Sequence, residues 1–340
     1  MKYAIGFIFF FFSLSSFNSC AGNAQKPYNT AHVQDQGILK IQRFDKDFHN
    51  YLTDPTIEQY NYLQKTYPHF LKAFSVVTVN MQDDEFENKE LFKQRFQSYF
   101  SNNVLSKIYD DALSVFSDLT LYENQLSDAD KLIQTYLEGK TLPRLSIHVS
   151  GFKANTIVLD SLISISADKY MGKDYLGYKQ FYEVYQTQQM QPDYIVRDFL
   201  KAWFMSEYPE LNVRKDLLSE IIYQGKILYA IGKVLPQWDE VDIVGYTPEQ
   251  LQWCNDSVKK IWKITVDRNY LFNNDFLIIQ KYMDEAPHTA TISTDSPGRI
   301  GAWLGLQIVK NYVKNTDTDL QSVLSENDNR KILKVAKYNP

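Results

Sequence analysis

The chain has 340 residues, and its 41 aspartates and glutamates outnumber its 36 lysines and arginines, which gives a formal net charge of −5. A nucleic-acid-binding protein needs a basic stripe or patch, and this sequence has none, so nucleic acid is not expected among its partners. The two cysteines, Cys20 and Cys254, are too few for a disulfide scaffold.

The N-terminus has the pattern of a secretory signal. The basic residue Lys2 precedes an apolar run at residues 4–14 (AIGFIFFFFSL) that is too short to span a bilayer. Cleavage before Cys20 would leave that cysteine as the lipidated first residue of the mature protein. We therefore predict a lipoprotein signal peptide at residues 1–19. The alternative is cleavage near Ala21, which would release a free periplasmic protein.

The segment at residues 20–37 is polar, contains a proline and a glycine, and is typical of a flexible tether between a membrane and a folded domain. Residues 38–340 contain no internal repeat and are predicted to form a single large globular domain, with a helical part at 38–141 and a second part at 142–340. No apolar run after the signal approaches 18 residues, so no membrane-spanning helix is expected.

The first part of the domain has mainly helical periodicity. Asp54 and Pro55 are predicted to begin a helix, as its N-cap and first-turn residue. Apolar side chains recur at helical spacing in the stretches that follow, and a glycine, Gly139, ends the last of them. The helices predicted from this spacing lie at residues 91–100, 108–116 and 126–137.

The pattern changes to strands near residue 142. Residues 145–149 alternate between apolar and polar side chains, residues 156–159 form a short apolar run, and Gly151 separates the two. Short runs of this kind, bounded by glycine, are typical of β-strands. We therefore predict a small sheet around residues 142–166.

Helical patterns return after the predicted sheet, at residues 192–204, 217–231, 248–270 and 297–314. Thr247 and Gln250 have the spacing of a capping box at the start of the third of these helices. Ser296 is predicted to cap the last helix. The fold class expected from the whole pattern is α+β, mainly α-helical with a small β-sheet.

The start of the last helix is rich in glycine. Gly298, Gly301 and Gly305 are expected on one helical face, and because glycine destabilises a helix by about 1 kcal/mol relative to alanine, something must approach that face closely. Close packing against a neighbouring helix is favoured over contact with a ligand. Arg299, predicted in the first turn, is poorly placed for the helix dipole, and is expected to pair with a carboxylate or to bind an anionic group.

No pattern of residues that supports catalysis is intact. The five histidines include no pair at the spacing that places two imidazoles on one helical face for zinc, and His148 is expected to be a hydrogen-bonded core or edge residue. Ser257 and Lys260 have the spacing of a serine–lysine pair, but the partner motifs are absent. Cys254 is expected to be a buried apolar residue. The sequence thus predicts no catalytic residue, no metal site and no cofactor.

Several short motifs together resemble a known family. They are residues 43–45 (RFD), 67–68 (YP), 223–229 (YQGKILY), 245–251 (GYTPEQL), 296–305 (SPGRIGAWLG) and 337–340 (KYNP). The SPGRIGAWLG element is the most specific of them. The chain resembles the gliding-motility lipoprotein GldB family of Bacteroidetes over nearly the whole mature part.

The layout of that family is similar to that of zincin-type zinc peptidases, and this resemblance implies a degenerate zincin-like core. It places Arg197, Asp198 and Lys201 where the peptidases have their metal-binding helix, and Gln224 where they have a glutamate. Arginine and lysine are cations that do not ligate zinc at neutral pH. The resemblance therefore implies a former metal cleft, and its candidate binding residues are these four together with Arg299.

The function implied by the resemblance is that of a non-catalytic accessory protein of the gliding or associated secretion machinery. Such a protein would be anchored in the cell envelope through a lipid on Cys20, would face the periplasm, and would act through contacts with other proteins. Two alternatives remain open. One is a metal-dependent peptidase-like hydrolase with unrecognised ligands, and the other is a glycan-binding envelope lipoprotein, which the high aromatic content would suit.

Overall fold

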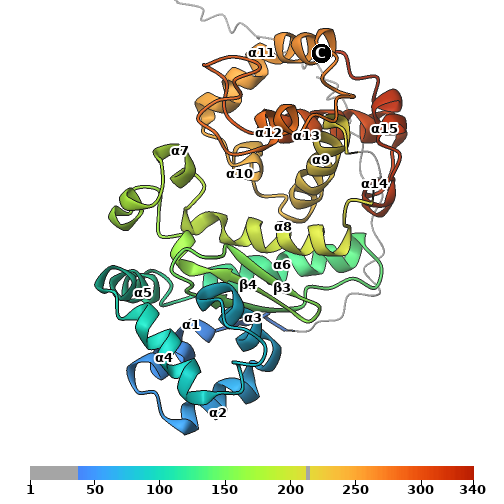
Figure 1. Ribbon diagram of the computed structural model, residues 1–340. Coiled ribbons are helices and arrows are strands. Elements are labelled where there is room, and N and C mark those ends of the chain that lie inside the picture. Colours follow the sequence, from blue (N-terminus) through green and yellow to red (C-terminus); the bar gives the residue numbers. More distant parts are fainter. Residues whose placement is uncertain (1–36, 212–214) are drawn as a thin grey trace, which may run out of the picture.

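The computed structural model describes residues 37–211 and 215–340 (Figure 1). The predicted signal peptide, the lipidation site Cys20 and the tether up to residue 36 lie outside the described residues. Among the helices of the described part, none is both long and apolar enough to cross a membrane.

The N-terminal part is helical, as predicted. Its helices are α1 (Phe44–Thr53), α2 (Ile57–Thr66), α3 (Pro68–Val79), α4 (Lys89–Phe100), α5 (Asn103–Val115) and α6 (Thr120–Tyr136). Phenylalanines hold them together: the rings of Phe74 and Phe96 stack with their centroids 5.6 Å apart, and Phe48 meets Phe96 edge-on at 4.8 Å. The spacing of aromatic residues that predicted α4 is therefore the spacing that builds this core.

The predicted start of α2 is wrong by two residues. Asp54 ends α1 as its C-cap, and α2 begins after Thr56, whose hydroxyl accepts a hydrogen bond from the main-chain N–H of Gln59. Threonine at position 56 has a side-chain oxygen in reach of the first turn, so the cap forms there and not before Pro55.

In the described part of the chain, the sheet has four strands in the order β1-β2-β4-β3. These are β1 (Ile41–Gln42), β2 (Arg144–His148), β3 (Thr156–Leu159) and β4 (Leu162–Ser166). β1, β2 and β4 run parallel, and β3 returns antiparallel to β4. The predicted sheet around residues 142–166 is confirmed, and the N-terminal segment adds β1 at one edge. β3 forms the other edge.

α8 (Ile195–Glu207) lies along one side of the sheet, where it contacts β3 and β4, while α1 and α3 lie on the opposite side (Figure 1). A segment of short turns connects β4 to α8 and protrudes from the molecule. It contains η2 (Ala167–Lys169), η3 (Leu176–Gln180), α7 (Val184–Thr187) and η4 (Pro192–Tyr194).

The C-terminal part is helical. Its helices are α9 (Leu217–Val234), α10 (Glu240–Val244), α11 (Pro248–Asp267), α12 (Phe276–Met283), α13 (Ile300–Thr316), α14 (Leu320–Ser325) and α15 (Asn329–Ala336). The predicted capping box is confirmed: Thr247 accepts from the main-chain N–H of Gln250, and the Gln250 side chain accepts from the N–H of Thr247.

The glycine-rich start of α13 differs in part from its prediction. Gly301 and Gly305 are buried against neighbouring helices, as expected for a close-packing face. Gly298, however, precedes the helix. Ser296 does not cap it, because its hydroxyl is used in the preceding turn, where it donates to the carbonyls of Ser293 and Thr289. Arg299 takes the N-cap position in the left-handed conformation, with φ of 54°.

Two clusters of buried apolar side chains make up the core. The first lies around the sheet, α8 and the N-terminal helices, and the second lies among the C-terminal helices. α9 contributes to both, through residues such as Ile227 in the first and Ile221 in the second. A single domain over residues 38–340 stays a prediction.

Candidate functional site

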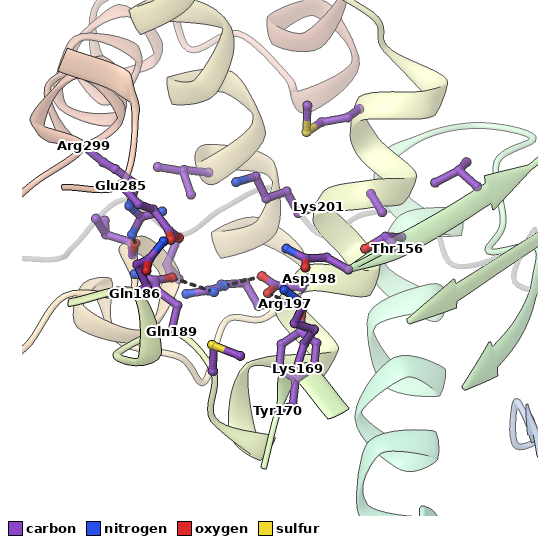
Figure 2. A pocket seen from close by; sticks show the side chains of 18 of the residues that line it. Thr156, Lys169, Tyr170, Gln186, Gln189, Arg197, Asp198, Lys201, Glu285 and Arg299 are labelled. Carbon is purple, nitrogen blue, oxygen red and sulfur yellow. Dashed lines mark hydrogen bonds and ion pairs between the residues drawn. The ribbon is translucent and has the colours of Figure 1, made fainter. Parts of the chain in front are cut away.

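A cavity of about 710 Å³ lies beside α8, between the edge strand β3, α10 and the residues that precede α13 (Figure 2). This volume is within the range of small-molecule and peptide sites in proteins. The charged side chains that line it are Lys169, Arg197, Asp198, Lys201, Glu285 and Arg299. Four of the five candidate residues predicted from the sequence therefore come together here, from α8 and from the start of α13.

Arg197 lies at the centre of this cavity but is only 5% exposed. Its guanidinium donates to Asp198 through Nε at 2.8 Å and to the Oε1 atom of Gln189 through Nη2 at 2.9 Å (Figure 2). The same group stacks over the ring of Tyr194, 4.2 Å from its centroid, and Nη1 donates to the carbonyl of Asp242. All parts of the guanidinium are thus engaged, and Arg197 holds α8 to the surrounding loops.

Asp198 is held by two partners. Its Oδ1 atom accepts from Arg197, and its Oδ2 atom accepts from the hydroxyl of Tyr170 at 2.8 Å. Burial by itself would raise the pKa of the Asp198 carboxyl, but the charge and hydrogen bond of Arg197 outweigh it and the pKa is lowered. The carboxylate is therefore charged and neutralised by its neighbour on the same helix.

Lys201 lies one turn further along α8, and Figure 2 shows its side chain directed into the cavity. Among the described residues, its ammonium has neither a hydrogen-bond nor an ion-pair partner. Burial lowers the pKa of this ammonium to about 8, and the nearby positive charge of Arg299 acts in the same direction, while Asp198 opposes them. A lysine in this state is a cation without a counter-ion.

Arg299 reaches the cavity from the opposite side. Its Nη2 atom donates to the main-chain carbonyl of Val244 at 3.0 Å, which fixes the guanidinium near the end of α10. Within residues 37–211 and 215–340 it forms no ion pair with a carboxylate, although Glu285 lines the same part of the cavity. The expected pairing with a carboxylate of this chain is therefore not found in that part.

Lys169 completes the set of cations. Its ammonium donates to the hydroxyl of Tyr182 and lies 4.5 Å from the centroid of the same ring. Burial lowers its pKa, and Asp168 opposes that shift. Lys169, Gln189 and Glu285 were not predicted from the sequence, because each comes from an irregular segment without periodicity. Their local sequence carries no signal that would have identified them.

Gln224, the fifth candidate, does not line the cavity. It lies on α9 beside Gly225, at the crossing with α13. Position 224, where the resemblance to zincins places a glutamate, therefore does not line the cavity that contains Lys201.

His148 is fully buried in β2, as predicted. Its Nδ1 atom is 2.7 Å from the hydroxyl of Ser164 on β4, and Nε2 has no hydrogen-bond partner among the residues that the structure describes. The rings of Phe70 and Phe74 lie against the imidazole. Burial lowers the pKa of His148 to about 3, so the side chain is neutral. In the described part of the chain, no three histidine, cysteine, aspartate or glutamate side chains are grouped closely enough to hold a metal ion.

A family model described as gliding motility protein GldB matches residues 24–340. The chain belongs to this family. The GldB family is not a known family of enzymes. No curated protein and no solved structure matches the chain. The resemblance to GldB stated from the sequence motifs is thus confirmed over nearly the whole chain, whereas the zincin-like core is not supported by any of the comparisons.

Proposed function

We propose that this protein is a membrane-anchored, non-catalytic accessory component of the gliding motility machinery and the associated secretion apparatus, and that it acts by binding another protein at the cavity beside α8. The observation that carries the proposal is the pair of cations, Lys201 and Arg299, that line this cavity without a carboxylate partner in the described part of the chain. Both side chains are partly shielded from water, and charge that is shielded and not paired lowers stability, so the presence of the two cations favours a role in binding.

The segment that protrudes near the cavity supports a protein partner. Leu176, Phe181 and Val184, on the segment that protrudes between β4 and α8, are 72, 48 and 86% exposed. A second hollow of about 370 Å³ adjoins the cavity, shares Gln189, Glu285 and Arg299 with it, and is lined by Val184. Exposed apolar side chains beside a hollow are typical of surfaces that another protein covers.

The chemistry of α8 favours a non-catalytic role. A zinc peptidase needs neutral imidazoles or carboxylates as ligands and a carboxylate that activates the metal-bound water. Here Arg197 is a permanent cation, and Asp198 is bonded to Arg197 and Tyr170. Elemental analysis of the purified protein tests this part: about one zinc per chain would contradict it.

Anchoring through Cys20 rests on the sequence of residues 1–20 and on the family, whose model carries the name GldB_lipo. Replacing the cysteine, Cys20→Ala, should move the protein from the membrane to the soluble periplasmic fraction. If the variant stays with the membranes, the anchor is not a lipid on this cysteine.

The binding role is tested by site-specific photo-cross-linking in gliding cells. A photoreactive side chain in place of Val184, which lines the adjoining hollow, should cross-link to a discrete protein, whereas one in place of Leu121, which is exposed on α6, should not. In parallel, Lys201→Met should reduce gliding, whereas Lys260→Met, on the exposed face of α11, should not. Absence of the Val184 adduct together with full gliding of the Lys201 variant would refute the proposal.

A further inference from the structure

β3 is an outer strand of the sheet, and no strand within residues 37–211 and 215–340 pairs with its outer edge. The main-chain N–H of Ser166 donates to the carbonyl of Asn155 at 2.9 Å, and the register pairs Ile157 with Ser164. In an antiparallel ladder, hydrogen-bonded pairs alternate with non-hydrogen-bonded pairs. It follows that the N–H and C=O groups of Thr156 and Val158 are directed away from β4.

The unpaired edge of β3 lies at the cavity. Asn155, Thr156 and Val158 are among its lining residues, together with Asp198 and Lys201 of the neighbouring helix α8 (Figure 2). An open strand edge is a template for another strand, because each outward N–H and C=O can pair with an extended peptide. The cavity therefore offers main-chain hydrogen bonds along one wall.

The lining of the cavity is also positively charged. The cavity has four cationic and two carboxylate side chains, and one of the carboxylates, Asp198, is neutralised by Arg197. Three cations then remain against one carboxylate, Glu285, and two of these cations, Lys201 and Arg299, have no ion-pair partner in the described part of the chain and can attract an anion. A carboxylate has two oxygens, so a single one can accept charge-assisted hydrogen bonds from both cations, and such bonds are stronger than neutral ones.

The remaining surface suits side chains of a peptide. Met205, Leu228 and Ile243 supply an apolar part of the lining. Successive side chains of an extended peptide point in opposite directions, so one set would meet this apolar surface while the other faces outward. The adjoining hollow, which shares Arg299, continues the groove towards α7 and gives room for a chain longer than the cavity itself.

We infer that the cavity binds an extended acidic segment of a partner polypeptide, which adds to the sheet as a strand beside β3 while one of its carboxylates binds Lys201 and Arg299. This inference rests on the proposed function and specifies the chemistry of the partner. The acidic group is an aspartate, a glutamate or a C-terminal carboxylate.

The test uses the full-length protein in detergent and a library of short random-sequence peptides displayed on beads. Peptides selected by the wild-type protein should be enriched in aspartate, glutamate or a free C-terminus. Replacing the acidic residue of a selected peptide by its amide should weaken binding about tenfold or more, the loss expected for one charge-assisted hydrogen bond. In an added strand, every second amide of the peptide faces β3 and the amides between them face away. N-methylation of the first set should therefore abolish binding, and N-methylation of the second set should leave it intact.

Three protein variants complete the test. Lys201→Met should weaken binding of the selected peptide about tenfold or more, and Lys260→Met should leave it unchanged. Val158→Pro removes an N–H that points away from β4, so all hydrogen bonds between β3 and β4 remain. Because edge strands tolerate proline, the variant should fold. It should lose peptide binding, since the missing N–H can no longer pair with the added strand. Thermal melts of all three variants check that the fold is intact. Lys201→Met should not unfold the protein, because the ammonium of Lys201 has no hydrogen-bond or ion-pair partner among the described residues.

Several results would overturn the inference. They are the absence of any selected peptide, binding that ignores the Lys201→Met change, and binding that tolerates N-methylation at all positions. Binding of inorganic phosphate or acetate alone, with no peptide preference, would assign the site to a free anion. If these results occur while the photoreactive side chain at Val184 still captures a protein, the inference fails and the proposed function stands. If the cross-link at Val184 is lost as well, both the inference and the proposed function are refuted.

Discussion

Gly225 of α9 lies against Gly305 of α13 where the two helices cross, and a Cβ atom on either glycine would collide with the backbone of the other helix. This crossing holds the start of α13, and with it Arg299, next to α9, which supplies Leu228 to the cavity. The two glycines therefore fix how closely α9 and the start of α13 approach each other beside the proposed binding site.

The first prediction concerns this crossing. Gly305→Leu should lower the free energy of unfolding by about 1–3 kcal/mol or more through overpacking, because its side chain would meet the main chain of Ile221. Gly301→Leu should be destabilising as well, since its Cβ would lie 3.0 Å from the carbonyl oxygen of Tyr282. Chemical denaturation of the purified variants measures both effects.

Gly232→Ala on the same helix α9 is the matched control. Its Cβ would meet only the flexible end of Ile243, so the variant should be as stable as the wild type or more stable by about 0.5–1 kcal/mol, the helical preference for alanine. Equal stability of the Gly305, Gly301 and Gly232 variants would show that the α9–α13 face is open and not closely packed.

The second prediction concerns the ion pair of Arg197 and Asp198. Arg197→Met should destabilise the protein by about 3–5 kcal/mol, because it leaves the buried carboxylate of Asp198 without its counter-ion. The double variant Arg197→Met/Asp198→Asn removes both charges and keeps an acceptor for Tyr170, so it should be more stable than Arg197→Met alone. A double-mutant cycle by denaturation measures the coupling, and additive losses would contradict the importance of the pair.

The regular elements could be predicted where local interactions decide them. The capping box of Thr247 and Gln250 fixes the start of α11, and the aromatic spacing of α4 builds the N-terminal core. The start of α13 could not be predicted, because the hydroxyl of Ser296 is taken by a turn that includes Thr289. That contact joins residues seven apart in an irregular segment, where no periodicity marks it.

The site was predictable only in part, for the same reason. Asp198 and Lys201 share one helical face, so their spacing alone places them together. Lys169 and Glu285 arrive at the cavity from turns distant in sequence, and the edge of β3 becomes a wall only through the strand order β1-β2-β4-β3. Gln224, which the resemblance to zincins grouped with Asp198 and Lys201, is not among the residues that line the cavity.

The third prediction is that the ammonium of Lys201 titrates near pH 8. Burial is the main cause of this lowered pKa and Arg299 adds to it, while Asp198 and Glu285 oppose the shift. Competitive labelling with an amine-reactive reagent, read by mass spectrometry against the same peptide released from the protein, should give half-maximal reactivity near that pH. Arg299→Met should raise the apparent pKa and Asp198→Asn should lower it. An ammonium that titrates as in the free peptide would place Lys201 in solvent and outside the cavity.

The last prediction concerns acid stability and rests on His148. In the unfolded chain its imidazole takes up a proton near pH 6.5, whereas in the folded protein burial lowers the pKa to about 3. A group whose pKa is lower in the folded state favours unfolding once the unfolded chain can take up the proton. Stability is therefore lost as the pH falls below 6.5, and the loss continues towards pH 3.

Between pH 7 and pH 5 this single residue should reduce the free energy of unfolding by about 2 kcal/mol. His148→Met removes the titrating group. Over the same pH interval, the free energy of unfolding of that variant should therefore fall by about 2 kcal/mol less than that of the wild type. Ser164→Ala is the control, because it removes the hydrogen bond to Nδ1 but leaves the imidazole buried, and should keep the acid dependence of the wild type. Urea denaturation at the two pH values measures each difference. A His148→Met variant as acid-sensitive as the wild type would mean that the imidazole is protonated, or reaches water, in the folded protein.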